Sequence, residues 1–153
     1  MTRDYQEIAE AIARRMRGVA EIGNVHIGRK LTQSSDEFRA IHFYEPQSRI
    51  HSWSIAREGF SDEQVATGHL HDVTHRFRIR GYLSLLNEVN SDLQFQRLVS
   101  GVANALDDDS DLDQACELAF PVQAETITER EFYETVCHYC ELTLQVREHH
   151  QSA

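Results

Sequence analysis

The sequence has little of what marks several familiar classes of protein. Its 153 residues include only 3 cysteines, 2 prolines and 7 glycines. An odd number of cysteines without a dense pattern argues against a disulfide scaffold and favours a reducing compartment. The low glycine and proline content argues against a collagen-like or low-complexity chain. No apolar run approaches the ~18 residues of a membrane span, and the N-terminal residues lack the apolar core and cleavage site of a signal peptide.

Catalytic motifs are also missing. The sequence has no GxSxG, P-loop, GxGxxG or HExxH pattern, and its serines lie in polar stretches without a neighbouring base. We therefore expect no enzyme activity, no catalytic residues and no cofactor. Length and a hydrophobic content of 41% predict one soluble domain over residues 1–153, made and kept in a cytoplasm.

What the chain does have is charge of one sign, distributed unevenly. The net charge is −10, and 14 of the 15 basic residues are arginine. Residues 1–80 hold 12 basic and 11 acidic residues, whereas residues 81–153 hold 3 basic and 14 acidic residues. Phosphate binding needs a basic footprint, so we expect no specific nucleic-acid binding. A membrane-surface helix is equally unsupported.

Hydrophobic periodicity predicts two helices and several strands. The fold class that this order predicts is α+β, in two layers, with a mainly antiparallel sheet and two helices packed on one face. The predicted helices cover residues 4–19 and 91–106, the second with a capping-box pattern at Ser91 and Gln94. The predicted strands cover residues 24–31, 38–45, 50–57, 71–85, 116–127 and 134–148, with a polar loop at 58–68 and an acidic loop at 107–113.

The strand predicted over residues 71–85 has an apolar face and a charged face. Alternation places Val73 and Phe77 on one side and Arg76, Arg78 and Arg80 on the other. Three like charges two residues apart repel and need water or acids. Two kinds of partner stay open: an acid on a neighbouring strand, for which Glu141 is the candidate, or another subunit. A protein surface is favoured over nucleic acid, because the rest of the chain would repel phosphate.

An acidic run follows the second predicted helix. Its five aspartates lie where the helix ends, and negative charge there opposes the helix dipole, which indicates another use for that charge. Pairing with an arginine-rich surface is one such use, and a solvated turn is the alternative. The predicted subunit interface therefore consists of Arg76, Arg78, Arg80, Asp107, Asp108, Asp109 and Asp111.

Calcium binding by this run is less well supported. An EF-hand loop starting at Asp107 has acids at positions 1, 3, 5 and 7. However, Leu112 replaces the glycine needed at position 6, and Leu118 replaces the bidentate glutamate at position 12. We assign no metal-binding residues on this basis.

Two further patterns have structural alternatives. Cys137 and Cys140 have CxxC spacing, but a strand would point them to opposite faces, which favours two packed strand residues over a zinc or redox site. His69, His71 and His75 share a parity that a metal-dependent enzyme could use. His75, however, lies on the apolar face, as a buried core histidine would.

Three stretches resemble small tail-completion proteins of long-tailed phages, namely the tail-terminator class and its Mu-like prophage relatives. They are the helical YQEIAEAIARRM, the strand THRFRIRGYLSL running into the helix FQRLVSGVANAL, and VQAETI followed by VCHYCELTLQVRE. Together they cover about half of the chain, and residues 29–68 match nothing in that family.

The resemblance implies a structural virion protein with no catalytic residues. Family members are α+β subunits that form a homo-oligomeric ring, often a hexamer, at the end of the tail tube, stop its growth and contact the head–tail connector. The expected partners are thus other copies of the chain, the tail tube protein and connector proteins, and the expected location is the virion tail after assembly in the bacterial cytoplasm. A ring needs two different complementary surfaces on each subunit, which suits separated basic and acidic regions. The alternative is another neck or connector subunit in head–tail joining.

Overall fold

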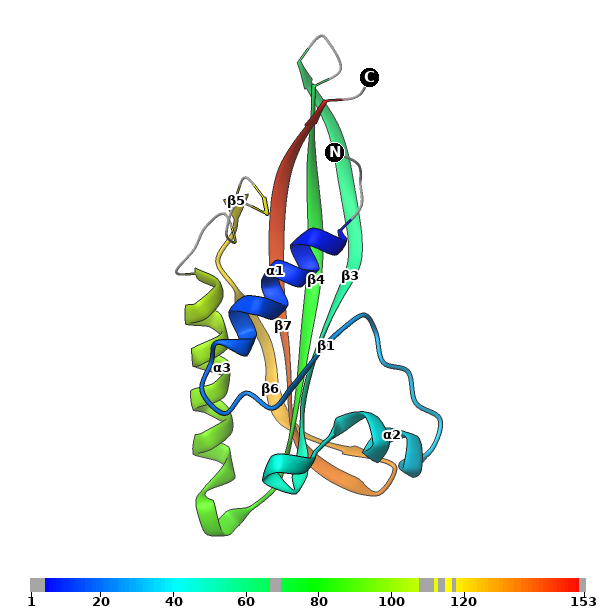
Figure 1. Ribbon diagram of the computed structural model, residues 1–153, viewed down its shortest axis with the longest axis vertical. Coiled ribbons are helices and arrows are strands. Elements are labelled where there is room, and N and C mark those ends of the chain that lie inside the picture. The colour runs from blue at the N-terminus through cyan, green and yellow to red at the C-terminus, as the bar shows by residue number, and fades with distance from the viewer. Residues whose placement is uncertain (1–4, 67–69, 108–111, 113–114, 117, 152–153) are drawn as a thin grey trace.

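The computed structural model describes residues 5–66, 70–107, 112, 115–116 and 118–151. The chain forms an α+β fold, as predicted, and its sheet is mixed (Figure 1). Its helices are α1 (Gln6–Arg17), α2 (Ser35–His42) and α3 (Ser91–Asp107). Its strands are β1 (Asn24–Ile27), β2 (Phe43–Tyr44), β3 (Arg49–Ala66), β4 (Leu70–Ser84), β5 (Leu118–Ala119), β6 (Gln123–Phe132) and β7 (Thr135–Gln151).

The sheet is built around three long strands. Its order is β1-β3-β4-β7-β5, while β2 also pairs with β3 and β6 also pairs with β7. The β1–β3 pairing is parallel, and every other pairing among the described residues is antiparallel. The sheet is therefore mixed, with the expected antiparallel pairing in most of it.

The predicted loop at residues 58–68 is wrong as far as Ala66, because β3 continues to that residue, and residues 67–68 lie outside the described part. Throughout this stretch β3 pairs with β4, from Arg57 opposite Phe77 to Ala66 opposite Leu70. The strand was missed because most of its side chains stay in water on both faces, so no alternation of apolar residues marks it. Figure 1 shows the consequence: β3, β4 and β7 extend as an arm beyond the helices.

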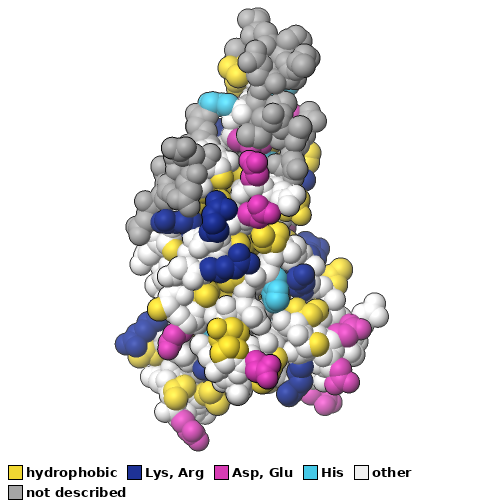
Figure 2. Space-filling model, viewed as in Figure 1, with side chains coloured by type: hydrophobic (Ala, Val, Ile, Leu, Met, Phe, Trp, Pro, Cys, Tyr) yellow, Lys and Arg dark blue, Asp and Glu magenta, His cyan; other side chains and the backbone are white. Residues whose placement is uncertain are grey.

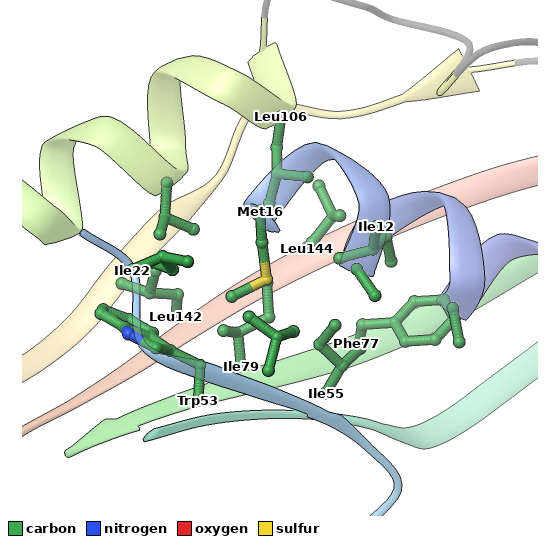
Figure 3. Close-up of a cluster of buried hydrophobic side chains, with 14 of the residues drawn as sticks. Ile12, Met16, Ile22, Trp53, Ile55, Phe77, Ile79, Leu106, Leu142 and Leu144 are labelled. Carbon is green, nitrogen blue, oxygen red and sulfur yellow. The ribbon is translucent and has the colours of Figure 1, made fainter. Parts of the chain in front are cut away.

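Helices α1 and α3 share one face of the sheet, and their apolar stripes form a single core with it (Figure 3). The stripe of α1 includes Ile8, Ile12 and Met16, all almost fully buried. They pack towards residues such as Trp53 and Phe77. The predicted stripes of both helices and the apolar face of β4 are thus confirmed, because each pattern belongs to a segment with one face in the core.

The strand predicted over residues 38–45 is wrong, because α2 occupies most of it. The Ser34 side chain accepts a hydrogen bond from the Glu37 amide at 3.2 Å, and Glu37 accepts one from the Gln33 amide at 2.8 Å. This is a helix-start signal that the aromatic residues obscured. Phe38 and His42, one turn apart, are then buried against the second face of the sheet, so α2 covers part of a face that the two-layer prediction left open.

Two smaller expectations also change. Asn90, rather than Ser91, caps α3, since its side-chain oxygen accepts from the Leu93 amide at 3.3 Å. Ser91 is buried instead. The single strand predicted over residues 116–127 is split around Pro121 into β5 and β6, because proline donates no ladder hydrogen bond.

Candidate functional site: an arginine–glutamate network beside an open strand edge

The arginine stripe of β4 lies on the sheet face opposite α1 and α3, and most of it is paired within the chain. Arg78 donates from Nε to Glu58 at 2.5 Å and from Nη1 to Glu141 at 2.6 Å. The same Nη1 donates to Glu125 at 3.0 Å. Arg80 donates to the second oxygen of Glu58 at 3.1 Å. The predicted pairing with Glu141 is confirmed.

The network brings together charges from four strands and one loop. Glu58 lies on β3, Glu125 on β6 and Glu141 on β7, while Arg29 follows β1 and reaches Glu58 at 3.3 Å. Side-chain exposure is 21% for both Arg78 and Arg80 and 20% for Glu141, so most of these contacts are partly shielded from water. Such pairs are screened by salt less than fully exposed ones.

The pKa values of the carboxyls agree with this geometry. Hydrogen bonding from Arg78 lowers the pKa of Glu58 below its ordinary value. Burial acts to raise the pKa of Glu141, but the hydrogen bonds from Tyr139 and Arg78, together with the charges of Arg78 and Arg80, outweigh it and lower that pKa. Both glutamates are therefore ionised at neutral pH and neutralise the two arginines.

Arg76 differs from its two neighbours on the stripe. It is exposed, and among the described residues it has no ion-pair partner. Its guanidinium lies over Gly59, where an added Cβ would come within 2.2 Å of Nη2. Arg76 also lines a hollow of about 560 Å³, together with Phe120 and Pro121. Of the three arginines assigned to an interface, Arg76 is the one whose charge is left for a partner.

The acidic half of the predicted interface is described only at its first residue. Asp107 ends α3, and its side chain accepts from the Val122 amide at 3.1 Å, which ties the helix end to the segment before β6. Asp108, Asp109 and Asp111 lie outside the described residues. Within the described part, no hydrogen bond or ion pair joins Asp107 to the arginine stripe. The assignment of both groups to a subunit interface stays a prediction.

The histidines of the alternative metal hypothesis have separate carboxylate partners. His71 contacts Asp62 at 2.7 Å, and the buried His75 contacts Glu148 at 3.2 Å. His69 lies outside the described residues. Burial, together with nearby Arg57, lowers the pKa of His75 to about 4, so its imidazole is neutral at pH 7.

The CxxC cysteines do point to opposite faces of β7. Cys140 packs in the core beneath α1 and α3, whereas Cys137 packs with Phe38 on the other side. Burial raises the pKa of the Cys137 thiol to about 11 and that of Cys140 to about 12. Both are therefore thiols at neutral pH and poor nucleophiles or metal ligands.

Next to the network, the outer edge of β3 along the arm has no strand partner among the described residues. β2 pairs with Arg49 and Ile50, and β1 pairs with residues 52–55. Beyond them, from residue 56 to residue 66, no described strand pairs with this edge. Phe60 and Val65 on the same stretch are 43% and 46% exposed. A long edge of this kind is a template for pairing with another chain.

A second group of exposed apolar side chains lies where α3 begins. Figure 2 shows apolar side chains at this lower end of the helix-bearing face. The exposed residues of this group are Leu85, Leu86, Val89 and Leu93. The arm and the start of α3 are far apart in Figure 1, so the molecule presents two separate apolar surfaces.

One cluster of potential metal ligands is not predicted from the sequence. Asp92, Glu129 and His138 place one ligand-type atom each within 4.8 Å of one another. No motif signals them, because they come from three different elements, α3, β6 and β7. The only local hint was His138 on the core-facing parity of the last predicted strand.

Comparison with models of protein families and with curated proteins finds no match to this chain. Among the described residues, no helix combines the length and the apolar character needed to cross a membrane.

Proposed function

We propose that this chain is a ring-forming structural subunit of a phage virion, a tail terminator that closes the end of the tail tube and contacts the head–tail connector. It acts by assembly rather than by catalysis. Its site of action is the virion tail, which it joins in the host cytoplasm. The segments that carry the resemblance to this class form α1, β4 with α3, and β6 with β7.

The observation that carries the proposal is that no described strand pairs with the outer edge of β3 along the projecting arm. Together with exposed apolar side chains such as Val65, this gives the edge the character of an incomplete interface. The second apolar surface, at the start of α3, gives the subunit a different face for a second contact. A ring requires two unlike surfaces of this kind, because each subunit meets its neighbours through opposite sides.

The distribution of charge also supports a ring-forming subunit. The arginine–glutamate network neutralises Arg78 and Arg80 within the subunit, so neither charge needs a partner from another chain. Arg76, beside the hollow, supplies a free positive charge for register with an acidic neighbour.

The direct experiment is assembly with the tail tube protein encoded by the same phage. Native mass spectrometry of the purified chain, alone and with tube protein, is expected to give a closed ring or a capped tube. Val65→Lys is expected to abolish both ring formation and tube capping, because lysine on an edge blocks strand pairing. Val65→Thr, which keeps the β-branched shape, is the matched control. A chain that stays monomeric and binds no tube protein would contradict the proposal.

Electron microscopy of particles that lack the protein separates the two virion roles. Overlong tails are expected for a terminator, since nothing then stops tube growth. Normal tails detached from heads would instead identify a neck or connector subunit.

A further inference from the structure

The cluster of Asp92, Glu129 and His138 lies between the start of α3 and the β6–β7 hairpin. Asp92 is in the first turn of α3. Glu129 on β6 is the direct cross-strand partner of His138 on β7. The helix start and both strands therefore converge on one point at the edge of the core.

His138 is held in a fixed orientation. It is only 4% exposed, and its ring stacks on Phe95 with ring centroids 5.5 Å apart. Its Nε2 is 2.8 Å from the Ser91 hydroxyl oxygen, which also accepts a hydrogen bond from the Leu86 amide at 2.9 Å. A hydrogen-bond partner of this kind fixes the ring direction of a metal-binding histidine.

The other ring nitrogen is directed at the carboxylates. Nδ1 of His138 is 4.0 Å from Glu129 Oε1, and within the described chain it makes no hydrogen bond. An imidazole nitrogen and two nearby carboxylates are donor groups that divalent transition metals bind.

The dimensions and the charge fit such an ion. Metal–ligand distances of about 2.0–2.2 Å put neighbouring ligands about 3–4 Å apart, and the three present atoms lie within 4.8 Å of one another. Asp92 and Glu129 are exposed, so small side-chain rotations close the difference. Arg49 is the opposing charge nearby, but it already donates to Gln94 and to the Ser84 carbonyl.

We propose that Asp92, Glu129 and His138 bind one divalent transition-metal ion, with Zn²⁺ as the probe, and that this ion links the start of α3 to the β6–β7 hairpin. Three protein ligands leave the ion at least one further position for water. The site is independent of ring formation, because all three ligands come from one subunit.

Calorimetric titration of the full chain with Zn²⁺ tests the site. Other histidine–carboxylate pairs exist, His71 with Asp62 among them, so the comparison between variants decides. Glu129→Gln and Asp92→Asn change exposed side chains and leave the fold intact. Each is expected to weaken the tightest binding event at least tenfold. Glu131→Gln removes the same charge from the same strand and is expected to stay within twofold of the unmodified chain.

A structural readout separates ligation from general attraction of cations. In NMR spectra of the histidine ring nitrogens, Zn²⁺ is expected to shift Nδ1 of His138, while Nε2 keeps its proton towards Ser91. Zn²⁺ should also raise the melting temperature of the unmodified chain but not that of Glu129→Gln. Equal Zn²⁺ affinity in those two proteins, or an equal loss in Glu131→Gln, would overturn the proposal. An unchanged Nδ1 signal at saturating Zn²⁺ would overturn it as well.

Discussion

Replacing Arg78 by methionine tests whether the arginine stripe is neutralised within the chain. Methionine keeps most of the aliphatic stem and removes the guanidinium. That group makes the hydrogen bonds to Glu58, Glu125 and Glu141. Without it, the three carboxylates face one another with less positive charge among them, which destabilises the folded state.

The structure sets the size of the expected effect. Glu125 is 50% exposed, so its bond to Arg78 contributes little, as exposed ion pairs do. Glu58 and Glu141 are 26% and 20% exposed, and each bond to them is expected to stabilise the fold by about 1–1.5 kcal/mol. We expect Arg78→Met to lower the free energy of unfolding by about 2–3 kcal/mol at pH 7.

The pH dependence has a definite sign. The pKa values of Glu58 and Glu141 are lowered in the folded chain from an ordinary value of 4.5. Their stabilisation is therefore fully present above pH 4.5 and is lost as the pH falls through the folded-state pKa values. The difference between the unmodified chain and Arg78→Met should thus shrink below pH 4.5.

Urea denaturation followed by circular dichroism measures this difference without adding salt that would screen it. Arg76→Met is the matched control, because Arg76 is exposed and has no ion pair among the described residues, and a change below about 0.5 kcal/mol is expected for it. Equal effects of the two substitutions at pH 7, or an effect of Arg78→Met that persists unchanged at pH 3, would show that the glutamates do not stabilise the fold through Arg78.

Two further predictions concern the interior. Gly81→Ala should destabilise the fold by about 1–3 kcal/mol in the same assay, because the new Cβ would lie 2.5 Å from the Trp53 ring; an unchanged urea midpoint would contradict it. Three buried histidines have pKa values lowered to about 4, mainly by burial, so the unfolded chain takes up their protons first as the pH falls below 6.5. As the pH falls from 6.5 to 4, each of these histidines should therefore lower the free energy of unfolding by about 1 kcal/mol per pH unit. His75→Gln should remove about a third of the combined slope. These histidines are His42, His51 and His75.

Local hydrophobic periodicity predicts the secondary structure correctly wherever one face of a segment meets the core. The stripe of α1, the alternation of β4 and the opposite directions of Cys137 and Cys140 all follow from helix and strand geometry alone. The aromatic segment around Phe38 shows the limit of such patterns. Its residue composition favours a strand, but the cap at Ser34 and burial against the second sheet face stabilise a helix instead.

Helices α1 and α3, the central strand β4 and the shared face of its three arginines therefore follow from local sequence patterns. The pairing of Arg78 with Glu58, which lies far from it along the chain, and the strand at residues 58–66 depend instead on how the segments pack together. The same packing places Asp92 and Glu129 beside His138. The physical reason is that periodicity records which face of a segment is buried, whereas contacts between segments depend on register and packing, which no single segment encodes.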